Sequence, residues 1–238
     1  MENNAKKVRI NKYLADKGLA TRRGVDALIE AGKVLVNGTK AVLGQKVGVE
    51  DVVELKGAVA QLNNVPRRYL AYNKPKGYVT HSPIEGEKEI SEVFDMKGLF
   101  ALGRLDKNSE GLLILTNDGR LTDRLLNPKY DHEKEYLVET EREVNAWFKD
   151  KLEKGVDIGE GERTKPCKIE LIDEHNFSIT ITEGKKHQVK RMTEALGVSV
   201  HNLKRIRIMN IELGKLKQNT TREIKGKELE LFLKALGL

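Results

Sequence analysis

Between residues 8 and 55, the pattern of apolar and polar positions predicts two short helices followed by a β-hairpin. Apolar residues at positions i, i+3 and i+4 share one face of a helix. Thr21 is a suitable N-cap for the second helix, and Gly32 suits a left-handed residue after its end. Asn37-Gly38 favours a tight turn between the two apolar runs of the hairpin. The apolar residues with helical spacing are Ile10, Tyr13 and Leu14, then Val25, Leu28 and Ile29.

The pattern changes after residue 66, where strand-like runs begin. Residues 69–72 (YLAY) predict a strand, and the Lys-Pro-Lys-Gly sequence at 74–77 predicts a turn. Residues 112–115 form an apolar run typical of a fully buried strand. Because residues 56–66 show little periodicity and end in a proline, we expect a linker. The predicted division is a first domain over 1–58, a linker over 59–67 and a mixed α and β domain over 68–238.

Charge and cysteine content narrow the range of functions. The chain has 43 Lys and Arg against 36 Asp and Glu, a net charge of +7, which favours a polyanionic partner. Its single cysteine, Cys167, excludes an internal disulfide and is typical of a reducing compartment. Since no apolar run approaches membrane-spanning length, we expect a cytoplasmic protein that does not bind a membrane.

Basic residues gather around the start of the second predicted helix. Arg22 and Arg23 occupy its first turn, where unpaired backbone N–H groups and the helix dipole favour a phosphate. Arg9 and Lys12 would extend this anion-binding face, although a solvated basic surface would look the same. The order helix, helix, hairpin and the runs R-I-x-x-Y-L-A, T-R-R and V-x-V-N-G resemble the S4 RNA-binding domain. The resemblance implies an RNA-binding module.

Asp106 is the candidate catalytic carboxylate of the second domain. It lies between Leu105 and the buried run 112–115, so its carboxylate can be partly desolvated. A nearby cation would keep it ionised and ready as a nucleophile or base. An aspartate beside a turn is more often a cap, so the chemistry alone leaves both interpretations open.

Three blocks of sequence resemble the motifs of one enzyme family, the pseudouridine synthases. They are residues 103–113 (GRLDKNSEGLL), which match an R-L-D nucleophile motif, residues 133–138 (EKEYLV), which match K-x-Y, and residues 183–192 (EGKKHQVKRM). The branch that the chain resembles is the ribosomal RsuA/RluB/RluF-like one. Residues 164–168 (TKPCK) and 207–210 (RIMN) tilt the resemblance towards its large-subunit RluF-like members.

This resemblance implies a fold and a reaction. The fold is α+β, with the S4-like domain followed by a catalytic domain built on an extended, mostly antiparallel sheet. The reaction breaks the C1′–N1 bond of a uridine, turns the base and joins C5 to C1′, so neither a cofactor nor a metal is expected. Asp106 would be the nucleophile or base, Tyr136 would stack on the base, and Lys190 would pair with Asp106 and hold it charged.

The resemblance also implies RNA-contacting residues in the second domain. A uridine must leave its stack to react, so Arg104 is a candidate to fill the vacated space. His187, Gln188 and Arg191 are expected near RNA because they belong to the third motif. A further basic cluster is interpreted as contacts to the RNA backbone, and its members are Lys204, Arg205 and Arg207.

The expected partner is ribosomal RNA of the large subunit, with transfer RNA as a further candidate and a monomer as the default state. Two other classes of function stay open. A non-catalytic RNA-binding ribosome-assembly factor would use the same S4-like domain and basic charge. A nucleoside or glycoside hydrolase would share carboxylate chemistry at C1′ but needs a second carboxylate. Glu110 is the nearby acid in the motif, and we interpret it as structural.

Overall fold

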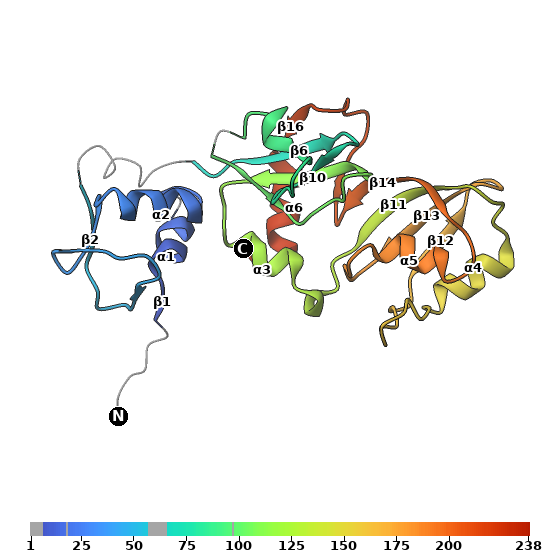
Figure 1. The fold of residues 1–238 in the computed structure, drawn as a ribbon, viewed down its shortest axis with the longest axis horizontal. Helices are drawn as coiled ribbons and strands as arrows, with labels where there is room; N and C mark the ends of the chain where they lie inside the picture. The colour runs from blue at the N-terminus through green and yellow to red at the C-terminus, as the bar shows by residue number, and fades with distance from the viewer. Residues whose placement is uncertain (1–6, 18, 57–65, 97) are drawn as a thin grey trace. The chain divides into compact units, whose positions relative to one another are not determined.

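The computed structural model describes residues 7–17, 19–56, 66–96 and 98–238 (Figure 1). The chain divides into two compact units, the first made of the segments up to Arg68, 96–100 and 116–121, and the second of the remainder. Most of the predicted linker, residues 59–65, lies outside the described residues. Among the described residues, no helix combines the length and the apolar character needed to cross a membrane.

The first unit contains the predicted helix, helix and hairpin. Thr21 caps the second helix by accepting a hydrogen bond from the Gly24 backbone N–H at 3.2 Å. Asn37 and Gly38 both have positive φ, as a tight hairpin turn requires. The buried core combines both helices with the hairpin and includes Ile10, Leu14, Val25, Ile29, Val34 and Val36. The elements are β1 (Val8–Arg9), α1 (Ile10–Asp16), α2 (Arg22–Glu30), β2 (Val34–Val36), β3 (Thr39–Lys40), β4 (Lys46–Val47) and β5 (Val53–Leu55).

A nine-stranded sheet organises the second unit, in the order β12-β13-β11-β14-β10-β6-β16, with β15 beside β14 and β9 beside β10. β10 and β14 run parallel, whereas β11 is antiparallel to both β13 and β14. The mostly antiparallel α+β architecture is therefore confirmed. Its strands are β6 (Tyr69–Lys74), β9 (Phe100–Leu102), β10 (Glu110–Thr116), β11 (Lys134–Thr140), β12 (Lys168–Leu171), β13 (Asn176–Ile181), β14 (Val200–Ile208), β15 (Ile211–Glu212) and β16 (Thr221–Glu223), and a separate parallel pair is β7 (Tyr78–Val79) and β8 (Lys88–Glu89).

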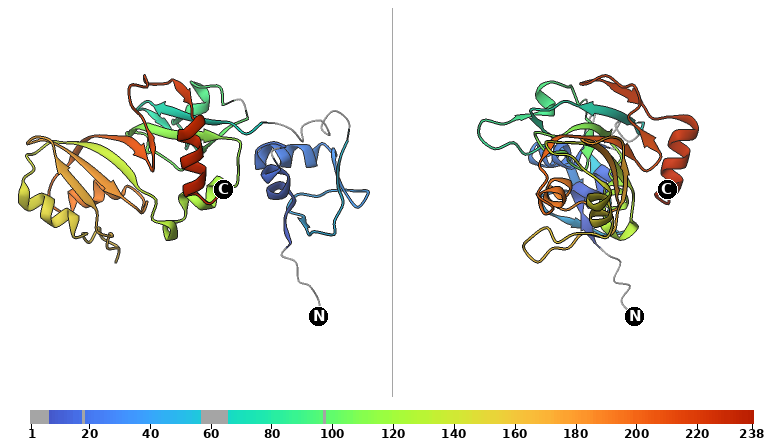
Figure 2. Two further views of the ribbon diagram at one scale, coloured as in Figure 1. Left: turned by 180° about the vertical axis from the view of Figure 1, so that it is seen from behind. Right: turned by 90° about the vertical axis from the view of Figure 1, so that its right-hand side faces the viewer.

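Helices cover the two halves of this sheet differently. α4 and α5 lie along the half that contains β12 and β13, whereas α3 and α6 lie along the half that contains β10, β6 and β16 (Figures 1 and 2). The helices are α3 (Leu121–Leu126), α4 (Ala146–Glu153), α5 (Gln188–Glu194) and α6 (Gly226–Ala235), with 3-10 turns η2 (Ile90–Glu92) and η3 (Pro128–Tyr130).

The parallel contact between β10 and β14 depends on Gly111. This glycine lies opposite Arg205 in the register and has a φ of 107°. A Cβ atom there would overlap the Arg205 carbonyl oxygen and lie 2.8 Å from its nitrogen. Glycine alone therefore allows the two strands to pack this closely. The approach brings the start of β10, and the loop that carries Asp106, next to Arg205.

Candidate active site

A pocket of about 510 Å³ lies in the second unit, where β11 and β14 meet the loop 103–109. Asp106 and Tyr136 both line it, so the structure brings together two of the three predicted catalytic residues. Pockets of this size can enclose a small ring system with polar groups at a few points of the wall. Its apolar lining is Leu102, Leu105, Leu125, Leu126, Ile181, Val189, Leu203 and Ile208.

Backbone hydrogen bonds fix the loop that carries Asp106. The Thr80 hydroxyl donates to the Leu105 carbonyl at 2.9 Å and accepts from the Leu105 N–H at 2.9 Å. On the other side, the Ser109 N–H donates to the Asp106 carbonyl at 3.0 Å. Because the backbone is held on both sides, the Asp106 carboxylate points from a defined position into the pocket that it lines.

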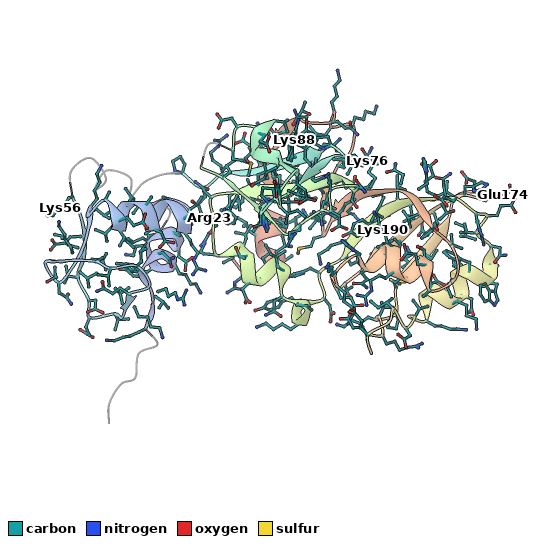
Figure 3. The ribbon with its side chains drawn as sticks, in the orientation of Figure 1. Arg23, Lys56, Lys76, Lys88, Glu174 and Lys190 are labelled. Atoms are coloured by element: carbon teal, nitrogen blue, oxygen red, sulfur yellow. The ribbon has the colours of Figure 1, made fainter. Side chains whose placement is uncertain are left out.

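The expected ion pair between Lys190 and Asp106 is not present in the structure. Instead, His187 Nε2 lies 3.5 Å from Asp106 Oδ1, with side chains 49% and 40% exposed. Among the described residues, no Lys190 nitrogen lies within ion-pair distance of this carboxylate. The start of α5 explains the difference, because His187, Gln188 and Val189 line the pocket. Lys190 follows them on the helix (Figure 3) and lies outside the lining.

Lys74 is a charged residue beside Asp106 that sequence reasoning missed. It ends β6, is fully buried, and its Nζ donates to the carbonyl oxygens of Pro75 at 2.9 Å and Ser109 at 2.8 Å. Burial lowers the pKa of Lys74 to about 8, although the nearby Asp106 and Glu110 carboxylates oppose that shift. The Lys-Pro-Lys-Gly sequence is typical of an exposed turn, so it gives no sign that Lys74 ends a buried strand.

Arg205, which the sequence predicts as a contact to the RNA backbone, is buried. Its side chain belongs to a residue that is 3% exposed, and its Nε donates to the Leu112 carbonyl at 2.7 Å. Alternation along β14 accounts for this, because Leu203 and Arg205 line the pocket while Lys204 lies between them. Arg207 also has partners within the protein, because it forms ion pairs with Glu133 at 3.0 Å and Glu135 at 2.7 Å. The three residues therefore do not form one exposed cluster, and contacts of Lys204, Arg205 and Arg207 with RNA stay predictions.

Gln188 and Arg191 serve the structure of the third motif. Gln188 is 4% exposed, and its amide donates to Glu183 at 2.8 Å and accepts from the Lys185 N–H at 2.9 Å. Arg191 donates to Glu162 at 2.7 Å and to the Ile158 carbonyl at 3.0 Å. These donors already have partners within the protein, and the prediction that Gln188 and Arg191 lie near RNA stays a prediction. They hold the turn that presents His187.

Comparison with known proteins was decisive for the family. The model of the RNA pseudouridylate synthase family matches residues 68–195, and the S4 domain model matches residues 8–53. The chain belongs to the RNA pseudouridine synthase family. A solved pseudouridylate synthase is similar over 96% of this chain and 99% of its own, with a TM-score of 0.69 and 30% identity. The S4 region and the mostly antiparallel catalytic sheet are thus features that the synthase shares with known relatives.

Several named relatives are similar to this synthase. The dual-specificity RNA pseudouridine synthase RluF of Escherichia coli is 38% identical, over 94% of this chain and 78% of that protein. The ribosomal small subunit pseudouridine synthase A of Pasteurella multocida is 35% identical, over 95% and 100%. The ribosomal large subunit pseudouridine synthase B of Xanthomonas axonopodis is 38% identical, over 86% of this chain and 40% of that protein.

Two further features of the pocket bear on how the synthase holds RNA. Tyr136 is 8% exposed and shares one face of β11 with Lys134, two residues before it, so both line the pocket. Arg104 is exposed and also lines the pocket. Its position beside Asp106 is compatible with the predicted role at a flipped nucleotide.

The S4 domain carries its basic residues on the surface. The predicted set, Arg9, Lys12, Arg22 and Arg23, is exposed throughout, and Figure 3 labels Arg23. Arg22 donates to the Asn11 side-chain oxygen at 3.4 Å, which links the start of α2 to α1. These four cations therefore remain available to an anion at the surface, as an RNA-binding role requires.

Proposed function

We propose that this synthase isomerises a specific uridine of large-subunit ribosomal RNA, with Asp106 as its catalytic residue. The observation that carries the proposal is the pocket itself, which the Asp106 carboxylate and the Tyr136 ring line together. The names of the relatives support a ribosomal substrate, since one is a large-subunit enzyme and another a small-subunit enzyme. Because RluF is named as dual-specificity, transfer RNA is the second RNA to test.

The reaction requires a carboxylate at the sugar and a surface that holds the freed base. In one route, Asp106 removes the C2′ proton, the C1′–N1 bond breaks, and the sugar remains as a glycal. In the other, an Asp106 oxygen bonds to C1′ as the C1′–N1 bond breaks. Tyr136 stacks on the base in both, which keeps it in place while it turns and C5 approaches C1′. No group donor or redox partner enters either balance.

The target uridine must leave its stack to reach Asp106. Flipping costs about a few kcal/mol, which contacts made in the pocket must offset. Arg104 is the proposed residue for the vacated space or a neighbouring phosphate, because it is exposed where the pocket opens beside Asp106. His187 contacts Asp106 in the free enzyme at 3.5 Å, so we expect the arriving nucleotide to displace it.

The S4 domain would raise affinity and choose the RNA stem, whereas the pocket chooses the uridine. Once one of two linked modules has bound the RNA, the effective concentration of the other module at its site is high. The S4 domain therefore strengthens binding without new contacts in the pocket. Lys204 remains a proposed contact to the RNA backbone. Lys190, predicted to pair with Asp106, is proposed instead as a longer-range cation for the RNA. We propose that the enzyme acts as a monomer in the cytoplasm, because ribosomal RNA offers no two-fold symmetric site to a dimer.

Hydrolysis is the less favoured chemistry on structural grounds. A hydrolase of this kind uses a second carboxylate to activate water. Glu110 is 7% exposed, and its carboxylate accepts hydrogen bonds from Asn202 at 3.3 Å and from Gln218. A carboxylate bound in this way supports the strands around it and is poorly placed to activate a water molecule.

Release of tritium from uridine C5 tests the proposal, because isomerisation expels that hydrogen whereas binding and hydrolysis leave it in place. Wild type and Asp106→Asn are each assayed on transcripts of both large ribosomal RNAs and of transfer RNA. We expect release by the wild type from a large-subunit transcript and none by the variant. Binding by both proteins without release, on transcripts and on precursor particles alike, would favour the assembly-factor alternative.

A further inference from the structure

One buried cation in the pocket has hydrogen-bonding capacity that the protein itself leaves unused. Arg205 Nε donates to the Leu112 carbonyl at 2.7 Å, and Nη1 donates to the Arg104 carbonyl at 3.4 Å. Nη2 is buried and has no hydrogen-bond partner in the part of the chain that the structure describes. Buried donors are nearly always paired, because an unpaired one forfeits its hydrogen bonds to water. An acceptor supplied by a ligand would satisfy Nη2.

Two further cations lie near this guanidinium. Lys134 lines the same pocket, and its Nζ donates to the His132 carbonyl at 3.2 Å. Burial, together with the Arg205 charge, lowers the pKa of Lys134. Lys74 is a third cation that Arg205 influences. Two carboxylates line the pocket, and Glu183 already accepts hydrogen bonds from the Gln188 amide and the Lys165 N–H. Asp106 is therefore the lining carboxylate that faces Arg205 and Lys134, and these cations favour a ligand group that carries negative charge.

Depth separates Arg205 from the cations that suit a phosphate. Arg104, Lys186 and His187 line the pocket as exposed residues, whereas Arg205 is 3% exposed. A flipped nucleotide enters base first, because its phosphates stay joined to the strand outside. The phosphates therefore meet the exposed cations, and the edge of the base meets Arg205. The Arg205 guanidinium also lies 6.0 Å from the centre of the Tyr136 ring, on which the base is expected to stack.

We propose that Arg205 is a further catalytic residue, whose Nη2 donates to a carbonyl oxygen of the flipped uracil and stabilises the charge on the departing base. The proposal rests on the proposed function. When the C1′–N1 bond breaks, its electron pair stays with uracil and spreads over N1 and the carbonyl oxygens. The base is then an anion, and either C1′ is bonded to an Asp106 oxygen or Asp106 holds the C2′ proton and the sugar is a glycal. When C5 bonds to C1′, the Asp106 oxygen leaves C1′ or the proton returns to C2′. The C5 proton then departs, N1 takes up a proton, and the base is neutral.

A preorganised donor that faces charge developing in the transition state accelerates a reaction strongly. Arg205→Gln keeps an amide that can donate to the Leu112 carbonyl but loses the charge. We expect it to bind RNA within about threefold of wild type and to slow single-turnover tritium release by roughly 10²–10³-fold. Arg222→Gln is the matched control, because Arg222 is a partly buried arginine paired with Glu228 away from the pocket lining. It should isomerise at the wild-type rate.

A merely structural arginine would slow the reaction without sensing the base oxygens, so the substrate is varied as well. Target RNA is prepared with uridine, 2-thiouridine or 4-thiouridine at the reactive position, because sulfur is a weak hydrogen-bond acceptor. For each thiouridine, the rate of tritium release from uridine RNA is divided by the rate from thiouridine RNA, in wild type and in Arg205→Gln. We expect this ratio to differ about tenfold between the two enzymes at one position, which identifies the contacted oxygen.

Each result has a defined meaning. Equal ratios in both enzymes at both positions overturn the proposal, and so does an Arg205→Gln protein that reacts at the wild-type rate. If Arg205→Gln does not fold by circular dichroism, Arg205→Lys enters the same comparison, because its compact charge cannot reproduce the two-sided contact of a guanidinium. If wild type releases no tritium from uridine RNA, the proposed function itself has failed, and the role of Arg205 fails with it.

Discussion

The synthase uses cations in two regions, and it treats them in opposite ways. At the candidate active site, Arg205 in the pocket and Lys74 beside Asp106 are buried and bound to backbone carbonyls. In the S4 domain, Arg22 and Arg23 lie on the surface around the start of a capped helix. Buried charges act over short range with little screening, whereas exposed charges act weakly and are screened by salt. The difference indicates chemistry in one region and binding in the other.

The largest effect that separates the two regions is expected at Asp106. Asp106→Asn removes the proposed nucleophile or base while keeping the shape of the side chain, so single-turnover isomerisation should fall by about 10²–10⁴-fold. RNA affinity should change by less than about threefold, because most contacts that hold RNA are made to its phosphates and sugars and not by a single carboxylate. Asp150→Asn, on exposed α4, is the matched control and should be silent. A large loss of affinity in Asp106→Asn would break the division between the regions.

The next effect sharpens the account of how the pocket is held. Gly111→Ala places a Cβ against the backbone of Arg205, so the strands must separate. We expect a loss of about 3–5 kcal/mol in the free energy of unfolding, which urea denaturation measures. Gly159→Ala is the control, because Gly159 has a φ of 85° but has open space where an added Cβ would lie. Equal losses in both variants would show that backbone strain, not the strand contact, decides the effect.

A pH effect tests whether the Lys74 ammonium group is buried near Asp106 and Glu110. Its pKa is about 8 in the folded protein and 10.5 in the unfolded chain. Between these values the unfolded chain binds more protons, so the Lys74 contribution to the free energy of unfolding rises with pH. Relative to Lys74→Met, wild type should gain about 1–3 kcal/mol from pH 7.5 to 10.

The comparison with Lys74→Met isolates this residue. Burial raises the pKa of Cys167 and of Tyr72, each to about 12, which acts in the opposite direction but equally in both proteins. Lys88→Met, at an exposed lysine labelled in Figure 3, is the matched control and should show no such gain. A difference between wild type and Lys74→Met that stays flat with pH would contradict the buried charge.

The smallest effect is expected on the S4 surface. Arg22→Gln with Arg23→Gln should weaken RNA binding by about tenfold at low salt and reduce the slope of log affinity against log salt by about 1–2. The rate with fully bound RNA should stay at the wild-type value. The control pair is Lys149→Gln on α4 with Lys154→Gln just after its end, because both lysines already pair with acidic neighbours. An unchanged salt slope in the S4 variant would remove Arg22 and Arg23 from the RNA interface.

The S4 domain was predictable because its signals are local. An N-cap threonine, a repeated apolar spacing and Asn37-Gly38 each specify structure within a few residues. The mostly antiparallel catalytic sheet was not predictable from periodicity, since its order depends on contacts between distant strands such as β10 and β14. Only the resemblance supplied it.

The pocket was predictable in part. Motifs identified Asp106 and Tyr136, which the structure brings together. Basic residues were harder, because composition cannot tell a buried cation from an exposed one. The alternation of Leu203 and Arg205 on β14 was a usable signal for a side chain that faces inward. The partners that Arg191 finds at Ile158 and Glu162 are distant along the chain, and no local pattern in the sequence indicates them.

One measurement tests most directly whether chemistry and binding reside in separate regions. RNA affinity and the single-turnover rate of tritium release are determined together, at low and high salt, for Asp106→Asn and for the Arg22→Gln, Arg23→Gln protein. The account predicts that the first loses its rate and keeps its salt-dependent affinity, while the second loses affinity and keeps its rate once RNA is saturating. A protein in which either change removes both properties would contradict it.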